Sequence, residues 1–240
     1  MTAFWFAVIA ALGNVAGGAA AVRGAKFGIR VIEFFVAFGA GFMLSVAFVR
    51  MLPEAYELSG HTAALYVLIG YLLVHLTQHT ATEHFHFGEE THRVTRMAGV
   101  TALFGLLLHT FFDGVAIASG FAVSESLGVL VFFAILLHKL PEGLTISSLQ
   151  IAGGMKPHQA LGSAALLGLA TIVGMLVTDS FLWLRANGLA VSAGVAIYVG
   201  ASNLVPEFQG KKGWRLPLAF FLGAAAFFVA NEVLVRVGIE

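Results

Sequence analysis

The feature that most constrains this chain is a series of eight apolar stretches, each close to the roughly 20 residues that a helix needs to cross a membrane. Runs such as 129–137 are apolar at odd and even positions alike, which favours helices and excludes the alternation of a membrane β-barrel. The sequence therefore predicts an all-α polytopic membrane protein. We expect spans at about 4–22, 31–54, 62–80, 97–121, 126–150, 158–183, 188–207 and 215–237.

The composition supports this fold class and excludes others. Hydrophobic residues make up 59% of the 240 residues and charged residues only 11%, which excludes an ordinary soluble domain and a disordered chain. The formal net charge is zero, so no basic surface favours nucleic acid as a partner. Cysteine is absent, so a bound metal would need His, Asp, Glu, Asn or Met as ligands. The lipid bilayer is the expected surrounding.

The connections between the spans are short, so we expect one transmembrane domain over 1–240, with loop 81–96 as its longest polar segment. Lys and Arg accumulate in cytoplasmic loops, and nine of the 13 in this chain fall in alternate connections. These nine are Arg23, Lys26, Arg30, Arg93, Arg96, Lys156, Lys211, Lys212 and Arg215. The bias predicts that both termini lie outside the cytoplasm.

Two adjacent spans carry ionisable groups in their middle, where such groups are costly and usually functional. The fourth span contains His109-x-x-x-Asp113-Gly114 and the fifth contains His138-x-x-x-Glu142-Gly143. The i,i+4 spacing places each histidine and carboxylate on one helix face. Because consecutive spans are antiparallel neighbours, the four groups can meet at one depth. Two imidazoles and two carboxylates suit zinc, and also iron(II), manganese or cadmium.

A second pattern suggests an inverted repeat. The second span ends in Pro53-Glu54 and the seventh in Pro206-Glu207, each after apolar residues. In the predicted orientation the two glutamates lie on opposite sides of the membrane. We therefore expect spans 1–3 to match spans 6–8 and span 4 to match span 5, a 3+2+3 bundle with inverted symmetry.

These features resemble the ZIP family (Zrt-, Irt-like proteins) of divalent-metal transporters. The resemblance rests on the two motifs of spans 4 and 5, on Pro53-Glu54, on the eight spans and on the His-bearing loop after span 3. It implies a metal site at His109, Asp113, His138 and Glu142. It also implies movement of Zn²⁺, or of Fe²⁺, Mn²⁺ or Cd²⁺, into the cytoplasm by a secondary transporter that is a homodimer.

The chain departs from the pattern of those family members that hold two metals side by side. Such members use a second polar residue after each motif histidine, and these positions are Thr110 and Lys139 here. An ammonium repels a second cation, so we infer a single metal and expect Lys139 to pair with Glu142 or Asp113. The carboxylate that such members place in span 6 corresponds roughly to Thr171. Met43 in span 2 is either an additional ligand or packing.

Further polar residues suggest a path to and from the site. Acidic groups at a mouth raise the local cation concentration. The candidates for the path are Glu54, Glu57, His61 and Glu232 at the outer ends, Asn203 and Glu207 near the inner end of span 7, and Asp179 in span 6. A histidine cluster at the inner end of span 3 and in the next loop is a candidate relay for weakly bound metal, or an ordinary polar loop. Its members are His75, His79, His84, His86 and His92.

Two other functions remain to be weighed. An intramembrane zinc hydrolase needs an open coordination position and a general base, but the sequence has no His-Glu-x-x-His motif. A structural protein would use its His–carboxylate pairs only to join helices. We favour a transporter over an enzyme and expect it in the bacterial inner (plasma) membrane. These residues are compatible with each of the four metals, and with either alternating access or a channel.

Overall fold

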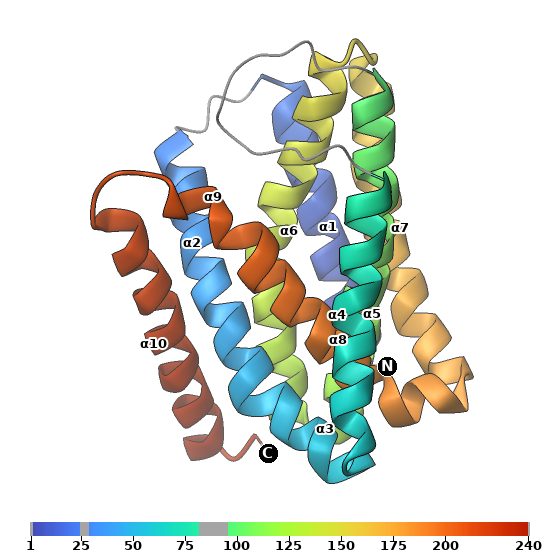
Figure 1. Ribbon diagram of the computed structural model, residues 1–240, viewed down its shortest axis with the longest axis vertical. Coiled ribbons are helices and arrows are strands. Elements are labelled where there is room, and N and C mark those ends of the chain that lie inside the picture. Colours follow the sequence, from blue (N-terminus) through green and yellow to red (C-terminus); the bar gives the residue numbers. More distant parts are fainter. Residues whose placement is uncertain (1, 25–28, 82–95, 240) are drawn as a thin grey trace.

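The computed structural model describes residues 2–24, 29–81 and 96–239, and these segments form helices without strands. Figure 1 shows the helices packed side by side along the long axis of the molecule. They are α1 (Thr2–Val22), α2 (Ile29–Val46), α3 (Leu52–Ser59), α4 (Thr62–Ala81), α5 (Arg96–Val123), α6 (Glu125–Ala152), α7 (Pro157–Ser180), α8 (Leu182–Tyr198), α9 (Pro206–Gln209) and α10 (Arg215–Arg236). Two π-helical turns, η1 (Ala47–Met51) and η2 (Val199–Leu204), join α2 to α3 and α8 to α9.

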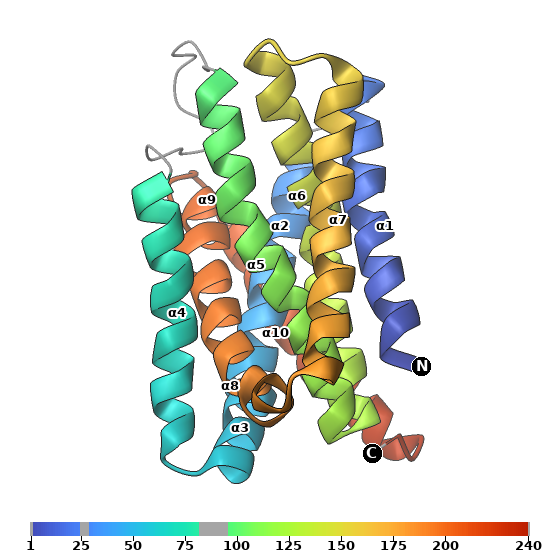
Figure 2. The ribbon, with the colours of Figure 1, turned by 90° about the vertical axis from the view of Figure 1, so that its right-hand side faces the viewer.

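The helices make eight passes along the molecule, because α2, η1 and α3 form one pass and α8, η2 and α9 form another. Seven described helices are long and apolar enough to span a membrane, and the eighth, α4, has a shorter apolar segment at Thr62–Gln78. Both chain ends lie toward the end of the bundle that carries α3 (Figures 1 and 2). The prediction of an all-α polytopic membrane protein is confirmed.

The turn between α7 and α8 corrects two expected boundaries. The sixth span was expected to run to residue 183 and the seventh to begin at 188, but α7 ends at Ser180 and α8 begins at Leu182. Phe181 alone breaks the helix, with an extended backbone (φ −110°, ψ 109°). The apolar residues 181–184 follow the turn directly, so they were counted as the end of the sixth span. The polar residues Arg185 and Asn187, expected in the loop, lie in the first turns of α8 instead.

Helix packing divides the bundle into groups. Helices α1, α5, α6 and α7 contact one another extensively, while α2 packs on α10 and α4 packs on α8. The closest approaches use glycines, which allow backbones to touch where lipid supplies no hydrophobic drive. A Cβ at Gly41 of α2 would overlap the backbone carbonyl of Phe220 in α10, and a Cβ at Gly194 of α8 would overlap that of Val67 in α4.

These contacts repeat at a fixed offset, as an inverted repeat requires. The two glycines are 153 positions apart in the sequence (41 and 194). The two residues that they contact (67 and 220) and the two prolines (53 and 206) are separated by the same number of positions. The passes that carry the prolines run in opposite directions, with α3 and α9 at opposite ends of the bundle (Figure 1). Equivalent contacts occur at the centre, where the offset is 29 between α5 and α6 and 157 between α1 and α7: Gly114 of α5 lies against the backbone of Thr171 in α7, and Gly143 of α6 lies against that of Asn14 in α1.

The two π-turns occupy equivalent places in this repeat. Leu52 N–H donates to the Ala47 carbonyl and Val205 N–H donates to the Gly200 carbonyl, each five residues back. A proline follows each of these donors. Because a proline ring clashes with the carbonyl four residues before it, a wider turn at this point lets each helix continue past its proline.

Candidate metal centre

The two motif histidines lie at equal depth on neighbouring helices. His109 is residue 14 of the 28 in α5, and His138 is residue 14 of the 28 in α6. Their rings are 5.6 Å apart between centroids. His109, Asp113, His138 and Glu142 are all at most 8% exposed. The i,i+4 spacing and the antiparallel packing of α5 and α6 therefore bring the four groups together, as the sequence predicts.

Lys139 lies between the two carboxylates. It is fully buried, and its Nζ donates to Asp113 Oδ2 at 2.6 Å and to Glu142 Oε2 at 2.9 Å. The ammonium thus contacts both carboxylates, where pairing with one of them was expected. A buried charge needs such partners because its removal from water is costly. The three charges sum to −1, so the cluster still attracts a cation.

The histidines present nitrogen atoms toward the carboxylates. His138 Nδ1 lies 3.0 Å from the Ala134 carbonyl, which can only accept, so this nitrogen carries the ring proton. In the neutral ring Nε2 then has a free lone pair, and it lies 3.4 Å from Asp113 Oδ2. Fixing the proton on one nitrogen by a backbone carbonyl is how metal-binding histidines are commonly oriented. His109 Nε2 is 3.3 Å from the same oxygen, but without hydrogen-bonding geometry.

The donor set fits a cation. One ligand atom from each of the four residues lies within 4.8 Å of the others, somewhat wider than the edge of about 3.3 Å in a tetrahedral zinc site. Among the described residues, both ring nitrogens of His109 and Oε1 of Glu142 are buried without a hydrogen-bond partner. Buried polar atoms are rarely left without a hydrogen-bond partner. A metal ion held between these residues would satisfy them after small side-chain rotations.

One neighbour of the cluster belongs to none of the motifs in the sequence. Asn14 of α1 is fully buried, and its Nδ2 donates to Glu142 Oε2 at 3.4 Å. The signal was present, since an asparagine is unusual in a span of Ala, Gly and large apolar residues. Nothing in the spacing of motifs, however, indicates which face of the first span meets the fifth.

The other residues expected to line the site are buried but bond elsewhere. Thr110 Oγ1 donates to the carbonyls of Leu106 and Leu107 in its own helix, at 2.9 and 3.1 Å. Thr171 Oγ1 lies 3.5 Å from the Leu167 carbonyl, one turn back in α7. Met43 belongs to the main apolar core. In this structure these side chains support the helices around the centre.

Most residues expected on the path lie toward the end of the bundle that holds the chain termini. Glu57 and His61 are exposed near the α3–α4 turn, and Glu54 is half-buried, 3.7 Å from Arg50. Glu232 is exposed near the end of α10, where it accepts from Arg236 at 2.9 Å.

The position of Asp179 in α7 differs from the expected one. It was expected inside the sixth span, but it is exposed and is the last residue but one of α7. The expected span ran three residues past the actual helix end, so its centre was misplaced. Asp179 therefore lies at the same end of the bundle as α3, far along α7 from the buried Thr171.

At the opposite end, Asn203 in η2 and Glu207 in α9 are half-buried. His75 is exposed and packs against aromatic rings, parallel to Tyr71 and edge-on to Tyr198. The remaining residues of the candidate relay, His84, His86 and His92, lie outside the described residues, as does the side chain of His79.

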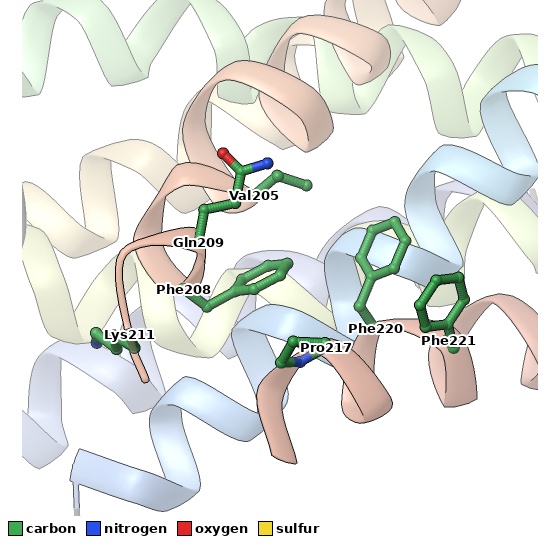
Figure 3. Close-up of a pocket in the computed structure, with 7 residues that line it drawn as sticks. All are labelled: Val205, Phe208, Gln209, Lys211, Pro217, Phe220 and Phe221. Atoms are coloured by element: carbon green, nitrogen blue, oxygen red, sulfur yellow. The ribbon is translucent and has the colours of Figure 1, made fainter. Parts of the chain in front are cut away.

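A surface pocket of about 340 Å³, whose lining side chains are drawn in Figure 3, shares no lining residue with the cluster. Its walls come from the α9 region and the first half of α10, and they are mainly apolar: Val205, Phe208, Gln209, Lys211, Pro217, Phe220 and Phe221. The ammonium of Lys211 pairs with Glu33 of α2 at 2.6 Å. None of these residues is a candidate metal ligand.

Comparison with known proteins agrees with the chemistry of the cluster. The profile of the family described as ZIP Zinc transporter matches residues 88–231, more than half of the chain, including both motif helices. No curated protein matches the sequence. The family consists of transporters, which leaves no support for the hydrolase alternative. On the family match and the buried His–carboxylate cluster together, the chain belongs to the ZIP family of divalent-metal transporters.

Proposed function

We propose that the chain is a secondary transporter that moves one divalent metal ion at a time into the cytoplasm, and that zinc is its main substrate. The ligands are His109, Asp113, His138 and Glu142, on α5 and α6. The observation that carries this proposal is the convergence of four buried ligand atoms within 4.8 Å, with unpartnered atoms among them. The donor set is also compatible with Fe²⁺, Mn²⁺ and Cd²⁺.

The single-metal stoichiometry follows from Lys139. Its ammonium contacts both carboxylates and occupies the place where a second cation would share them. With one divalent ion bound, the charge of the cluster changes from −1 to +1. A second ion would raise it to +3 in a buried site, which the low dielectric of the interior strongly disfavours.

The remaining features form one scheme. The whole chain, 1–240, acts as a single transporter domain in the bacterial inner membrane, with both termini outside, and it assembles as a homodimer. The acidic residues near α3 and the end of α10 attract cations at the outer mouth. Asn203 and Glu207 lie on the inner route, and the histidines of loop 81–96 receive exiting metal weakly.

The test is metal uptake by proteoliposomes that contain the purified chain. Asp113→Asn and Glu142→Gln each remove one negative charge without changing size, and each should abolish saturable Zn²⁺ uptake. Thr178→Val is a matched control, because Thr178 is buried in α7 and bonds only the Gly174 carbonyl of its own helix. Wild-type uptake kinetics in either carboxylate variant would refute the assignment. Competition by Fe²⁺, Mn²⁺ and Cd²⁺ ranks the substrates.

A further inference from the structure

Asn14 carries a buried amide whose bonding is incomplete. The residue is 0% exposed in the middle of α1. Its Nδ2 has Glu142 Oε2 as a partner at 3.4 Å, and its Oδ1 is buried without one. An unpartnered buried acceptor costs about 1–3 kcal/mol, so an apolar residue of this size would stabilise the fold better. This imbalance suggests a role in the site.

The direction of the Asn14–Glu142 contact is fixed by charge. With the amide reversed, Oδ1 would face a carboxylate oxygen and the two would repel, so Nδ2 is the atom that faces Glu142. Oε2 of Glu142 then accepts from two donors, Asn14 and Lys139. Oε1 of the same carboxylate has no partner. One oxygen is therefore held and the other is free for a ligand.

The backbone around Asn14 is locked against α6. A Cβ at Gly143 would overlap the Asn14 carbonyl, and one at Gly17 would overlap the Leu140 carbonyl. At Gly13 a Cβ would lie 3.1 Å from the Cβ of Lys139. Helix α1 thus lies in direct backbone contact with the segment that carries Lys139 and Glu142. Asn14 cannot shift along α6 without disturbing this contact.

We infer that Asn14 is a positioning residue of the metal centre, which holds Oε2 of Glu142 so that Oε1 alone binds the cation. The inference rests on the proposed function, because it requires Glu142 to be a ligand. Without the amide, the carboxylate can rotate and bind through both oxygens. Loss of such an outer partner usually weakens metal binding by about 10–100-fold. Helix α1 then belongs to the metal centre together with α5 and α6.

The test is a titration of the purified chain in detergent with Co²⁺, whose visible absorption reports coordination number. The wild type should show the intense bands of four-coordinate Co²⁺. Asn14→Leu, which keeps the branched shape of the side chain and removes the donor, should bind Co²⁺ at least about tenfold more weakly and with less intense bands. Thr178→Val should match the wild type. Wild-type affinity and spectrum in folded Asn14→Leu would overturn the inference.

Two further variants keep the outcome decisive. If Asn14→Leu fails to fold, Asn14→Asp replaces the donor with a carboxylate of the same size, which repels Glu142 and should alter the spectrum; a wild-type spectrum there would overturn the inference. Glu142→Gln tests the site itself. If the Co²⁺ spectrum of the wild type does not depend on Glu142, the proposed function fails. If it does, but the Asn14 variants behave as wild type, only the role of Asn14 fails.

Discussion

Replacing Lys139 by aspartate should convert the centre from one metal to two. The Lys139 ammonium lies 2.6 Å from Asp113 Oδ2 and 2.9 Å from Glu142 Oε2. A metal bound by the same carboxylates would lie about 4 Å from that position, which is also the spacing of paired metals in two-metal sites. An aspartate at 139 removes the tethered cation and adds a ligand at the vacated place.

The size of the effect follows from the charges. Two unit charges about 4 Å apart interact by about 4 kcal/mol at an effective dielectric constant of 20, and a divalent ion doubles this to about 8 kcal/mol. Exchange of Lys for Asp turns a repulsion of that size into an attraction, a difference of about 16 kcal/mol before rearrangement and screening. Even a quarter of it, about 4 kcal/mol, changes the Kd of a metal ion at this distance about a thousandfold.

Equilibrium dialysis against Zn²⁺, followed by elemental analysis, measures the stoichiometry directly. The chain has six methionines and no cysteine, so its sulfur is an internal standard for protein. In a sulfur-free detergent, the wild type should show one zinc per six sulfurs and Lys139→Asp two. Lys139→Asn, which matches aspartate in size but has no charge, should bind one zinc more tightly than the wild type. A folded Lys139→Asp chain that binds a single zinc would refute the role of the lysine.

Two further predictions concern stability, measured by thermal unfolding in detergent. Gly114→Ala should destabilise the chain by about 1–3 kcal/mol or more, because its Cβ would overlap the backbone carbonyl of Thr171 and force α5 from α7. Gly162→Ala, with open space at its Cβ, should be neutral or stabilising, and equal losses in the two variants would contradict the packing argument. Arg50→Ala should cost about 1–3 kcal/mol, because the guanidinium donates to Asn231 of α10 at 2.6 Å. An unchanged melting temperature would show that this contact contributes nothing.

The fold was predictable because its strongest determinant is local. A helix in lipid must satisfy its own backbone groups, so an apolar run of sufficient length already specifies a helix. The convergence of His109, Asp113, His138 and Glu142 was predictable for a similar reason: i,i+4 spacing acts within a helix, and consecutive spans are neighbours. The turn at Phe181 was not, because the apolar residues 181–184 that follow it look like a continuation of the same span.

The role of α1 was not predictable, because it depends on contacts between distant segments. The position of Asn14 beside Glu142 is set by the glycines that bring α1 and α6 into backbone contact. Glycines occur throughout the spans, and the sequence does not indicate which of them face each other. Exposure has the same limitation: Asp179 was expected inside the sixth span, but α7 ends three residues earlier than that span and leaves Asp179 exposed next to the helix end.

The backbone follows the inverted repeat, but the side chains at its centre differ between the two halves. Residues 109 and 138 are both histidines, but the next positions, related by the same offset of 29, are Thr110 and Lys139. The equivalent contacts of Gly114 and Gly143 likewise place Thr171 on one side and Asn14 on the other. Both groups that donate to the Glu142 carboxylate, Lys139 and Asn14, come from the α1–α6 half, whereas both threonines bond only their own helices. Symmetric packing alone would make the two halves of the centre equivalent. The differences at positions 110 and 139, and at 171 and 14, make the two halves chemically distinct. These are therefore the positions at which metal number and affinity should respond most to substitution.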